Sequence, residues 1–200
     1  MIKIKEIEGI KIEMNFDYKG GTRKVIESMP NISKDDHYAI QYIGIWKIMF
    51  DCVNNMNAKT ILEFGTRDGY STRMFSKILD VTDGNVYTVD INPPKNDLSE
   101  FKNVHVITKD IKDFSWTIPV DILYIDDWHN GYWLYHELEK FAHLAKVVMI
   151  HDIALDDDLY NGMKEWCSHN MMIYTVYKVN GCGLAIIEVE KSKTFYKEEA

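Results

Sequence analysis

Ionisable side chains lie at or shortly after the ends of four of the apolar runs in this 200-residue sequence. They are Glu63, Asp90, Asp126, His129, His151 and Asp152. If the runs are parallel strands of one sheet, their carboxyl ends lie along one edge and these side chains surround a single crevice. Carboxylates accept hydrogen bonds from hydroxyl groups, an acid–imidazole cluster can hold a divalent cation, and an imidazole can take a proton near neutral pH. The pattern predicts a ligand site with acid–base or metal chemistry.

A glycine turn follows the first of these runs. The turn reads Glu63-x-Gly65-x-x-x-Gly69 and leads into an amphipathic stretch at 70–79, which predicts the strand, turn and helix that open a nucleotide-binding unit. Gly65 lets the chain turn sharply, and Gly69 lets backbone approach a ligand. A dinucleotide-binding fingerprint would need glycine at the position of Arg67. An acid before the turn repels a pyrophosphate but attracts a cation, so we expect Glu63 to lie near an ammonium or sulfonium group.

This turn resembles that of class I S-adenosylmethionine-dependent methyltransferases, and it is most similar to the turn of catechol-type O-methyltransferases. The resemblance places six residues around the cofactor S-adenosylmethionine: Glu63, Gly65, Gly69, Ser71, Asp90 and Asp110. Among them, Asp90 would accept hydrogen bonds from the ribose hydroxyls, and Asp110 would reach the adenine amino group. A simple turn-capping role for Asp110 is an equal alternative.

Two later segments, 125–132 and 150–152, extend the resemblance. Catechol-type methyltransferases carry metal-binding acids after the fourth strand and an Asp-Asn pair after the fifth. Asp126 matches the first position, but His151 and Asp152 stand where the pair would be, which leaves Mg²⁺, another divalent metal or no metal open. The candidate metal ligands are Asp126, His151 and Asp152. The segments also resemble bacterial methyltransferases of sugars and antibiotic precursors, which implies that His129 or His151 takes the proton of the acceptor hydroxyl.

The resemblance implies methyl transfer from S-adenosylmethionine to a hydroxyl of a small molecule, such as a sugar, a polyketide or a catechol-like compound. Two other classes of function stay open at this point. One is a non-catalytic nucleotide-binding module with the same fold. The other is a dinucleotide oxidoreductase, which Arg67 disfavours.

Strands and helices are predicted to alternate along the chain. The predicted strands are 60–64, 85–89, 104–107, 120–125, 146–150, 172–179 and 184–189, and the predicted helices are 36–57, 70–79, 97–101, 132–142 and 159–170. This order indicates an α/β fold, a three-layer Rossmann-like sandwich around a mostly parallel, seven-stranded sheet with a C-terminal antiparallel hairpin. We expect an N-terminal arm and leader at 1–36, a methyltransferase domain at 37–190 and a charged tail at 191–200.

Composition limits the compartment and the partners. The net charge of −8 argues against nucleic-acid binding, because neutralising phosphates requires a basic face. The N-terminus has no signal-peptide pattern, and no apolar run approaches the ~18 residues of a membrane span. Three scattered cysteines indicate a reducing compartment. The sequence predicts a cytoplasmic protein that acts on a small-molecule acceptor without a membrane or nucleic-acid partner, and it leaves a homo-oligomer open.

Overall fold

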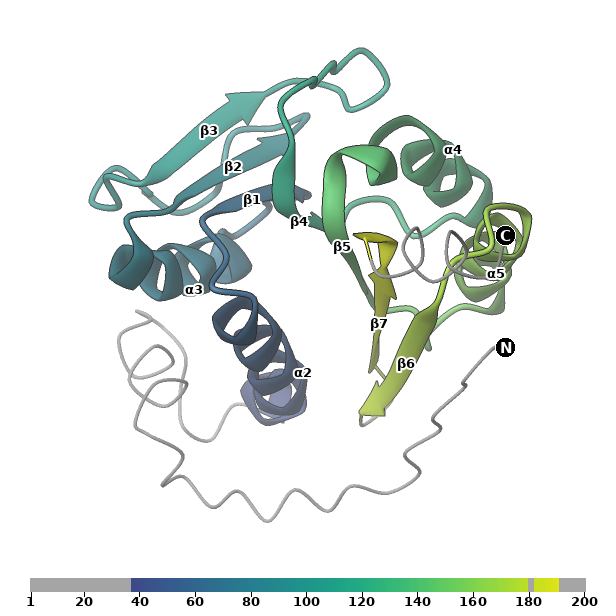
Figure 1. The fold of residues 1–200 in the computed structure, drawn as a ribbon. Coiled ribbons are helices and arrows are strands. Elements are labelled where there is room, and N and C mark those ends of the chain that lie inside the picture. The colour runs from purple at the N-terminus through teal and green to yellow at the C-terminus, as the bar shows by residue number, and fades with distance from the viewer. Residues whose placement is uncertain (1–36, 180–181, 191–200) are drawn as a thin grey trace.

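The computed structural model describes residues 37–179 and 182–190. These residues form a seven-stranded sheet with helices on both of its faces (Figure 1). The predicted three-layer α/β architecture is therefore confirmed. The predicted leader at 1–36 and the charged tail at 191–200 lie outside the described residues, so both stay predictions.

The elements occur in the predicted order. The strands are β1 (Thr60–Phe64), β2 (Asn85–Asp90), β3 (Val104–Thr108), β4 (Val120–Ile125), β5 (Ala145–His151), β6 (Tyr174–Val179) and β7 (Cys182–Glu188). The helices are α2 (His37–Asn55), α3 (Tyr70–Leu79), α4 (Gly131–Phe141) and α5 (Asp157–His169), with short 3₁₀ turns η1 (Asp80–Thr82) and η2 (Ala142–Leu144). The predicted helix at 97–101 is wrong: Asp97 caps a turn there by accepting from the backbone N–H of Ser99. So short a segment cannot offset the cost of helix nucleation.

The strand order of the sheet is β3-β2-β1-β4-β5-β7-β6. The first five strands in this order run parallel, whereas β7 runs antiparallel to β5 and pairs with β6 at the edge. The predicted C-terminal hairpin is thus confirmed. Because β1 lies between β2 and β4, the strand order reverses beside β1, and open sheets bind ligands at such a switch point.

Each face of the sheet carries its own apolar core. Helices α2 and α3 cover one face, and α4 and α5 cover the other (Figure 1). Side chains alternate along β1, so Ile61 packs in the core under α2 and α3, whereas Leu62 and Phe64 pack in the core under α4 and α5. The same alternation directs Glu63 towards the α3 face.

Asp121 joins the amino ends of three strands. Its Oδ2 atom accepts hydrogen bonds from the backbone N–H groups of Lys59 (2.7 Å) and Thr60 (3.0 Å), and its Oδ1 atom lies 2.8 Å from Lys146 Nζ. Burial would raise the pKa of Asp121, but these bonds outweigh burial and hold it below its ordinary value. The carboxylate therefore ties β1, β4 and β5 together at the edge opposite the switch point.

We expect Asp121→Asn to lower the free energy of unfolding by about 1–2 kcal/mol, because an amide replaces a charged acceptor of two backbone bonds and Lys146 is half exposed. Urea denaturation measures this loss. Asp113→Asn, on the exposed surface, is the matched control and should change stability little. Equal effects of the two changes would contradict the assignment.

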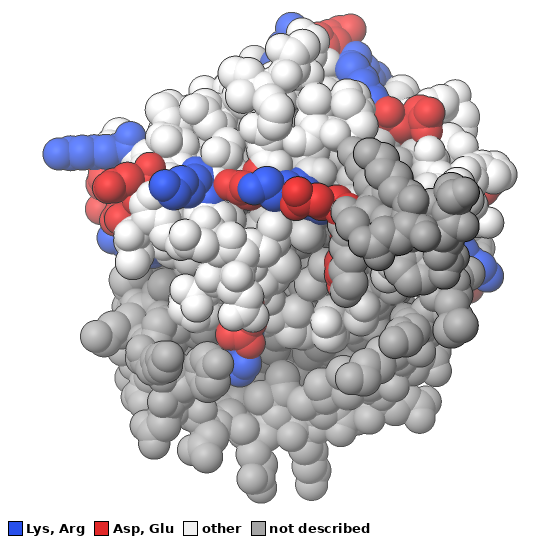
Figure 2. All heavy atoms as spheres, in the orientation of Figure 1, with Lys and Arg blue, Asp and Glu red and all other residues white. Residues whose placement is uncertain are grey.

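The surface of the described residues carries charges of both signs. On the face that Figure 2 presents, basic and acidic side chains lie next to one another. Exposed ion pairs such as Lys47–Asp51 (2.6 Å) and Lys95–Asp68 (3.6 Å) each contribute at most about 1 kcal/mol. Among the described helices, none combines the length and apolar character that crossing a membrane requires.

Candidate active site

The glycine turn after β1 brings three strand ends together. Gly65 has a φ of 89°, in the left-handed region, and a Cβ atom there would clash with the backbone carbonyl of Asp126. Its N–H donates to Val89 O (2.9 Å), and the N–H of Asp126 donates to Phe64 O (2.9 Å). Only glycine therefore allows the ends of β1, β2 and β4 to approach this closely.

We expect Gly65→Ala to lower the free energy of unfolding by about 2 kcal/mol or more, because it adds backbone strain and a clash with Asp126. Urea denaturation measures the loss. Gly69→Ala is a matched comparison: its φ is also positive, at 74°, but a Cβ would meet only the flexible side chain of Leu98. A Gly65 variant as stable as the Gly69 variant would contradict this explanation.

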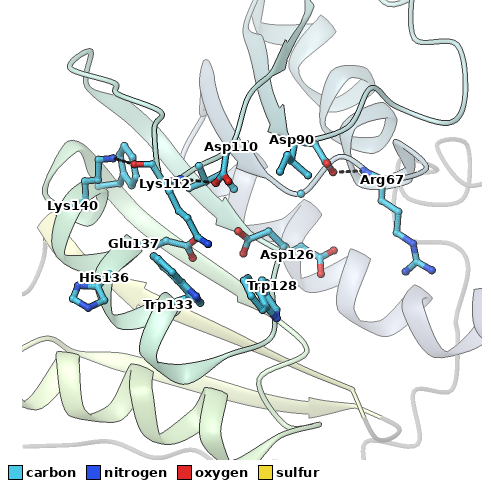
Figure 3. Close-up of a pocket in the computed structure, with 15 residues that line it drawn as sticks. Arg67, Asp90, Asp110, Lys112, Asp126, Trp128, Trp133, His136, Glu137 and Lys140 are labelled. Carbon is cyan, nitrogen blue, oxygen red and sulfur yellow. Dashed lines mark hydrogen bonds between the residues drawn. The ribbon is translucent and has the colours of Figure 1, made fainter.

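Asp90, at the end of β2, holds the glycine turn in place. Its Oδ2 atom accepts from the backbone N–H groups of Thr66 (2.9 Å) and Arg67 (3.0 Å), and its Oδ1 atom accepts from Asn92 (2.9 Å). Figure 3 shows the bond to Arg67. A carboxylate has about four acceptor sites, so Asp90 can still accept about one further hydrogen bond from a ligand.

A cavity of about 670 Å³ opens beside this turn. Three of the predicted cofactor residues, Gly65, Asp90 and Asp110, line it together with Asp126. Figure 3 labels the three aspartates among them. Its volume lies within the usual range for small-molecule sites. The topology thus brings the ends of β1, β2 and β4, which the sequence predicted to meet, onto one cavity together with the end of β3, whereas the β5 residues His151 and Asp152 do not line it.

Asp110 caps the turn after β3, which is one of the two roles predicted as alternatives. Its Oδ1 atom accepts from the backbone N–H of Lys112 (2.9 Å), and its carbonyl accepts from Asp113 (3.0 Å), so it caps the turn after β3. The residue also lines the cavity. Its contact with an adenine stays a prediction.

Glu63 lies beneath the turn rather than on the cavity wall. It is fully buried, and its Oε1 and Oε2 atoms accept hydrogen bonds of 2.5 Å from Ser71 Oγ and Thr72 Oγ1, respectively. Burial raises its pKa to about 7, although these hydroxyl bonds act in the opposite direction. Neither Glu63 nor the predicted residues Gly69 and Ser71 line the cavity. In this structure Glu63 anchors the first turn of α3, and its contact with a ligand cation stays a prediction.

We expect Glu63→Gln to change how stability depends on pH. The pKa of Glu63 is raised from its ordinary 4.5 to about 7, so the folded state binds more protons in this window. The stability of the wild type therefore falls as pH rises from about 4.5 to 7, by roughly 3 kcal/mol from this group. Glutamine cannot ionise, so urea unfolding at about pH 5 and pH 8 should show a smaller loss in the variant. Equal losses would contradict the assignment.

Two acids and two imidazoles form a cluster at the ends of β4 and β5. Ile125 pairs with Ile150 in the sheet, so the residues that follow them lie side by side. His151 Nδ1 lies 3.1 Å from Asp126 Oδ1 and 3.3 Å from Asp152 Oδ1. His129 Nε2 lies 3.2 Å from Asp152 Oδ2 and 4.0 Å from Asp126 Oδ1. The structure therefore brings together all four side chains predicted for catalysis or metal binding.

Opposite charges set the pKa values in this cluster. Burial would lower the pKa of His151, but the Asp126 and Asp152 carboxylates outweigh burial and raise it to about 10. The hydrogen bond to Asp152 raises the pKa of His129 against the effect of burial. Burial would raise the pKa of Asp152, but the two imidazoles bring it well below its usual range. Each carboxylate thus stabilises the cationic form of its histidine partners.

The cluster also fits a divalent cation. Asp126, His129 and Asp152 each offer a ligand atom, and these atoms lie within 4.8 Å of one another. Two carboxylates and one imidazole form a donor set that suits Mn²⁺, Fe²⁺ or Zn²⁺. The sequence placed His151 in the metal set, but its Nδ1 atom lies between the two carboxylates as their hydrogen-bonding partner. The geometry favours His129 as the imidazole ligand.

Sequence reasoning missed several residues of the cavity wall. Asp127 and Glu137 line it, and Lys112 Nζ lies over the rings of Trp133 (4.3 Å) and Trp128 (5.3 Å). A signal for Glu137 was present, since this acid interrupts the apolar face of α4 formed by Leu134, Leu138 and Phe141. No sequence signal marked the Lys112 contacts, because they join the loop after β3 to the loop after β4 and to the start of α4.

These observations define a class of fold. A seven-stranded sheet with this strand order, a glycine turn after β1 and an acid at the end of β2 form the Rossmann-like fold of class I S-adenosylmethionine-dependent methyltransferases. The predicted resemblance to this class is thus confirmed at the level of the fold.

Solved structures of methyltransferases share this fold. A methyltransferase from Podospora anserina with bound SAH (S-adenosylhomocysteine) matches with a TM-score of 0.58 and 14% identity, over 85% of this chain and 86% of that one. The O-methyltransferase from Bacillus cereus in complex with SAH matches with a TM-score of 0.58 and 16% identity, over 84% of this chain and 90% of that one. A cyclopropane-fatty-acyl-phospholipid synthase-like protein from Lactobacillus casei matches with a TM-score of 0.54 and 12% identity, over 79% of this chain and 78% of that one. No protein-family profile and no curated protein matches the sequence.

Proposed function

We propose that this protein transfers the methyl group of S-adenosylmethionine to a hydroxyl oxygen of a small molecule. The observation that carries the proposal is the convergence of the Gly65 turn, Asp90 and Asp110 on one cavity, next to the acid–imidazole cluster that begins at Asp126. The neighbours from Podospora anserina and Bacillus cereus hold SAH, the product that such a reaction leaves. We place the ribose at Asp90, the adenine in the cavity beyond it and the methionine end towards Asp126.

The chemical step is an in-line displacement. The acceptor oxygen attacks the methyl carbon, the bond from this carbon to sulfur breaks, and the sulfur keeps the electron pair and becomes the thioether of SAH. The acceptor hydroxyl loses its proton in the process. The chain therefore has to align the two reactants and to provide a group that receives this proton.

His129 is the proton acceptor in this proposal. Its side chain is 39% exposed, so an acceptor molecule can reach it, and its Nε2 atom faces Asp152, which leaves Nδ1 to take the proton. His151 is 3% exposed and enclosed by Asp126 and Asp152. We therefore assign His151 to positioning these two carboxylates.

With a divalent cation bound, Asp126, His129 and Asp152 would be its ligands, and its positive charge would lower the pKa of the acceptor hydroxyl so that the proton leaves to solvent instead of to His129. We expect dialysis against EDTA to reduce methyl transfer about ten-fold or more, and added Mn²⁺ to restore it. Elemental analysis of the protein before and after dialysis is the control. A rate that EDTA leaves unchanged would assign proton removal to His129 alone.

Trp128 supports an acceptor with a flat ring. Its side chain lines the cavity and is 62% exposed. An aromatic face of this kind favours stacking with a catechol-like or polyketide ring, and it can also pack on the apolar face of a sugar. We propose these three classes of hydroxylated molecule as the acceptors to be tested.

Isothermal titration calorimetry with SAH tests the proposal first. The wild type should bind SAH with one site per chain, and a failure to bind would reject the function. Mass spectrometry should then detect methylated product when S-adenosylmethionine is supplied with catechol, sugar or polyketide acceptors. Binding of SAH without transfer to any hydroxyl acceptor would instead support a non-catalytic nucleotide-binding module.

A further inference from the structure

Tyr124 is a buried tyrosine on β4, two residues before Asp126. It is 1% exposed and belongs to the apolar core under α2 and α3. Its neighbours across the sheet are Glu63 on β1 and Met149 on β5, so it lies in the middle of the parallel part of the sheet. Side chains two residues apart along a strand point to the same face, which brings the hydroxyl of Tyr124 to Asp126.

The hydroxyl of Tyr124 donates a hydrogen bond to Asp126. Its Oη atom lies 3.1 Å from Asp126 Oδ2. A phenol carries a proton at neutral pH whereas a carboxylate can only accept, so the direction of this bond is fixed. The ring of Tyr124 packs edge-on against Phe75 of α3, with ring centroids 5.1 Å apart and an angle of 73° between the rings. The packing of the core therefore aims the hydroxyl at Asp126.

The core itself does not require this hydroxyl. A phenylalanine would fill almost the same space beside Phe75 and Ile122, and a buried hydroxyl loses its hydrogen bonds to water. The bond to Asp126 offsets this loss, and it gives the carboxylate a donor on the side that faces the core. The hydroxyl is thus better explained by what it does to Asp126 than by packing.

The two oxygen atoms of Asp126 have different partners. Oδ2 accepts from Tyr124, whereas Oδ1 lies 3.1 Å from His151 Nδ1 and 4.0 Å from His129 Nε2. The last torsion of an aspartate side chain has a broad range, so a carboxylate held on one side only can turn. A bond to each oxygen limits this rotation. The orientation of Asp126 is therefore fixed from the core as well as from the histidines.

We propose that Tyr124 is a positioning residue for methyl transfer, which holds Asp126 Oδ2 and so keeps Oδ1 turned towards His129 and His151. The inference rests on the proposed function, which places the reacting groups beside Asp126. Tyr124 acts through Asp126 alone, since it is buried and does not line the cavity. Replacing an outer partner of a metal-binding side chain typically lowers metal affinity or activity by about ten- to 100-fold.

Tyr124→Phe tests this role, because it removes the hydroxyl and keeps the ring. We expect kcat for methyl transfer to fall about ten-fold, with the KM for S-adenosylmethionine and the affinity for SAH unchanged. Calorimetry should also show that the variant binds Mn²⁺ about ten-fold more weakly than the wild type does. Tyr174→Phe is the matched control, since it removes a buried hydroxyl from the core under α4 and α5. It should keep the wild-type kcat and Mn²⁺ affinity.

The outcomes separate this inference from the function on which it rests. If the wild type neither binds SAH nor transfers a methyl group, the proposed function fails. If the wild type is active and Tyr124→Phe keeps its kcat, only the role of Tyr124 is overturned. A parallel loss of SAH affinity would also overturn it, because a disturbed fold would then explain the lower rate. If the wild type binds no Mn²⁺, kcat alone decides. Thermal unfolding shows that each variant is folded.

Discussion

Asp90→Ala should bind SAH at least about 100-fold more weakly than the wild type, the largest loss of binding that we expect from a single substitution. The change removes the acceptor for the backbone N–H groups of Thr66, Arg67 and Asn92, and these hydrogen bonds hold the glycine turn in its observed shape. It also removes the carboxylate that we assign to the ribose hydroxyls. The two losses add, because one acts on the shape of the site and the other on the ligand itself.

Calorimetry measures this loss, and urea denaturation shows how much of it comes from the turn. Hydrogen bonds to a charged group each contribute about 1.5–3 kcal/mol, so the variant should also lose about 3 kcal/mol of stability. Asp83→Ala, on the exposed surface, is the control and should retain SAH binding. If Asp90→Ala binds SAH within ten-fold of the wild type, the ribose does not lie at Asp90.

Asp152→Asn should reduce the rate of methyl transfer by about 100-fold or more while leaving SAH binding unchanged. Asp152 lies 3.2 Å from His129 and 3.3 Å from His151, so its charge orients the proposed base and balances the cluster. The amide keeps the shape of the side chain but removes its charge. Release of SAH from S-adenosylmethionine, in the presence of an acceptor identified by mass spectrometry, measures the rate.

The backbone conformation at Asp152 lets the Asp152→Asn substitution change the charge without adding strain. Asp152 has a φ of 54°, in the left-handed region that asparagine also adopts readily, so the substitution adds no strain. Asp83→Asn is a matched control, since Asp83 is exposed and has a φ of 51°. Activity of Asp152→Asn close to that of the wild type would exclude Asp152 from both proton transfer and metal binding.

Local patterns in the chain were sufficient to predict the fold. Alternation of apolar runs and amphipathic stretches places strands such as β1 and β4 at the predicted residues, because burial in a parallel sheet requires short continuous apolar segments. The glycines at 65 and 69 have positive φ angles, as a turn of this shape requires. The sequence also predicted that Asp90 and Asp126 meet at one cavity, since this follows from strand direction, and the family resemblance added Asp110.

The partners of each side chain were decided by tertiary structure. Alternation along β1 turns Glu63 under α3 to Ser71 and Thr72, although its place before the turn suggested contact with a ligand. The register of β4 against β5 places His151 between two carboxylates and leaves His129 exposed, whereas the sequence ranked the two histidines alike.

The residues of the cavity wall also show what local sequence determines and what tertiary structure decides. The sequence by itself determined which segments form strands and helices and which strand ends carry acids, because these properties depend on neighbours along the chain. The packing of α4 against the sheet determined that Glu137 is buried and lines the cavity. Such contacts join residues that are distant in sequence, and only the three-dimensional arrangement of helices and strands sets the distances between them.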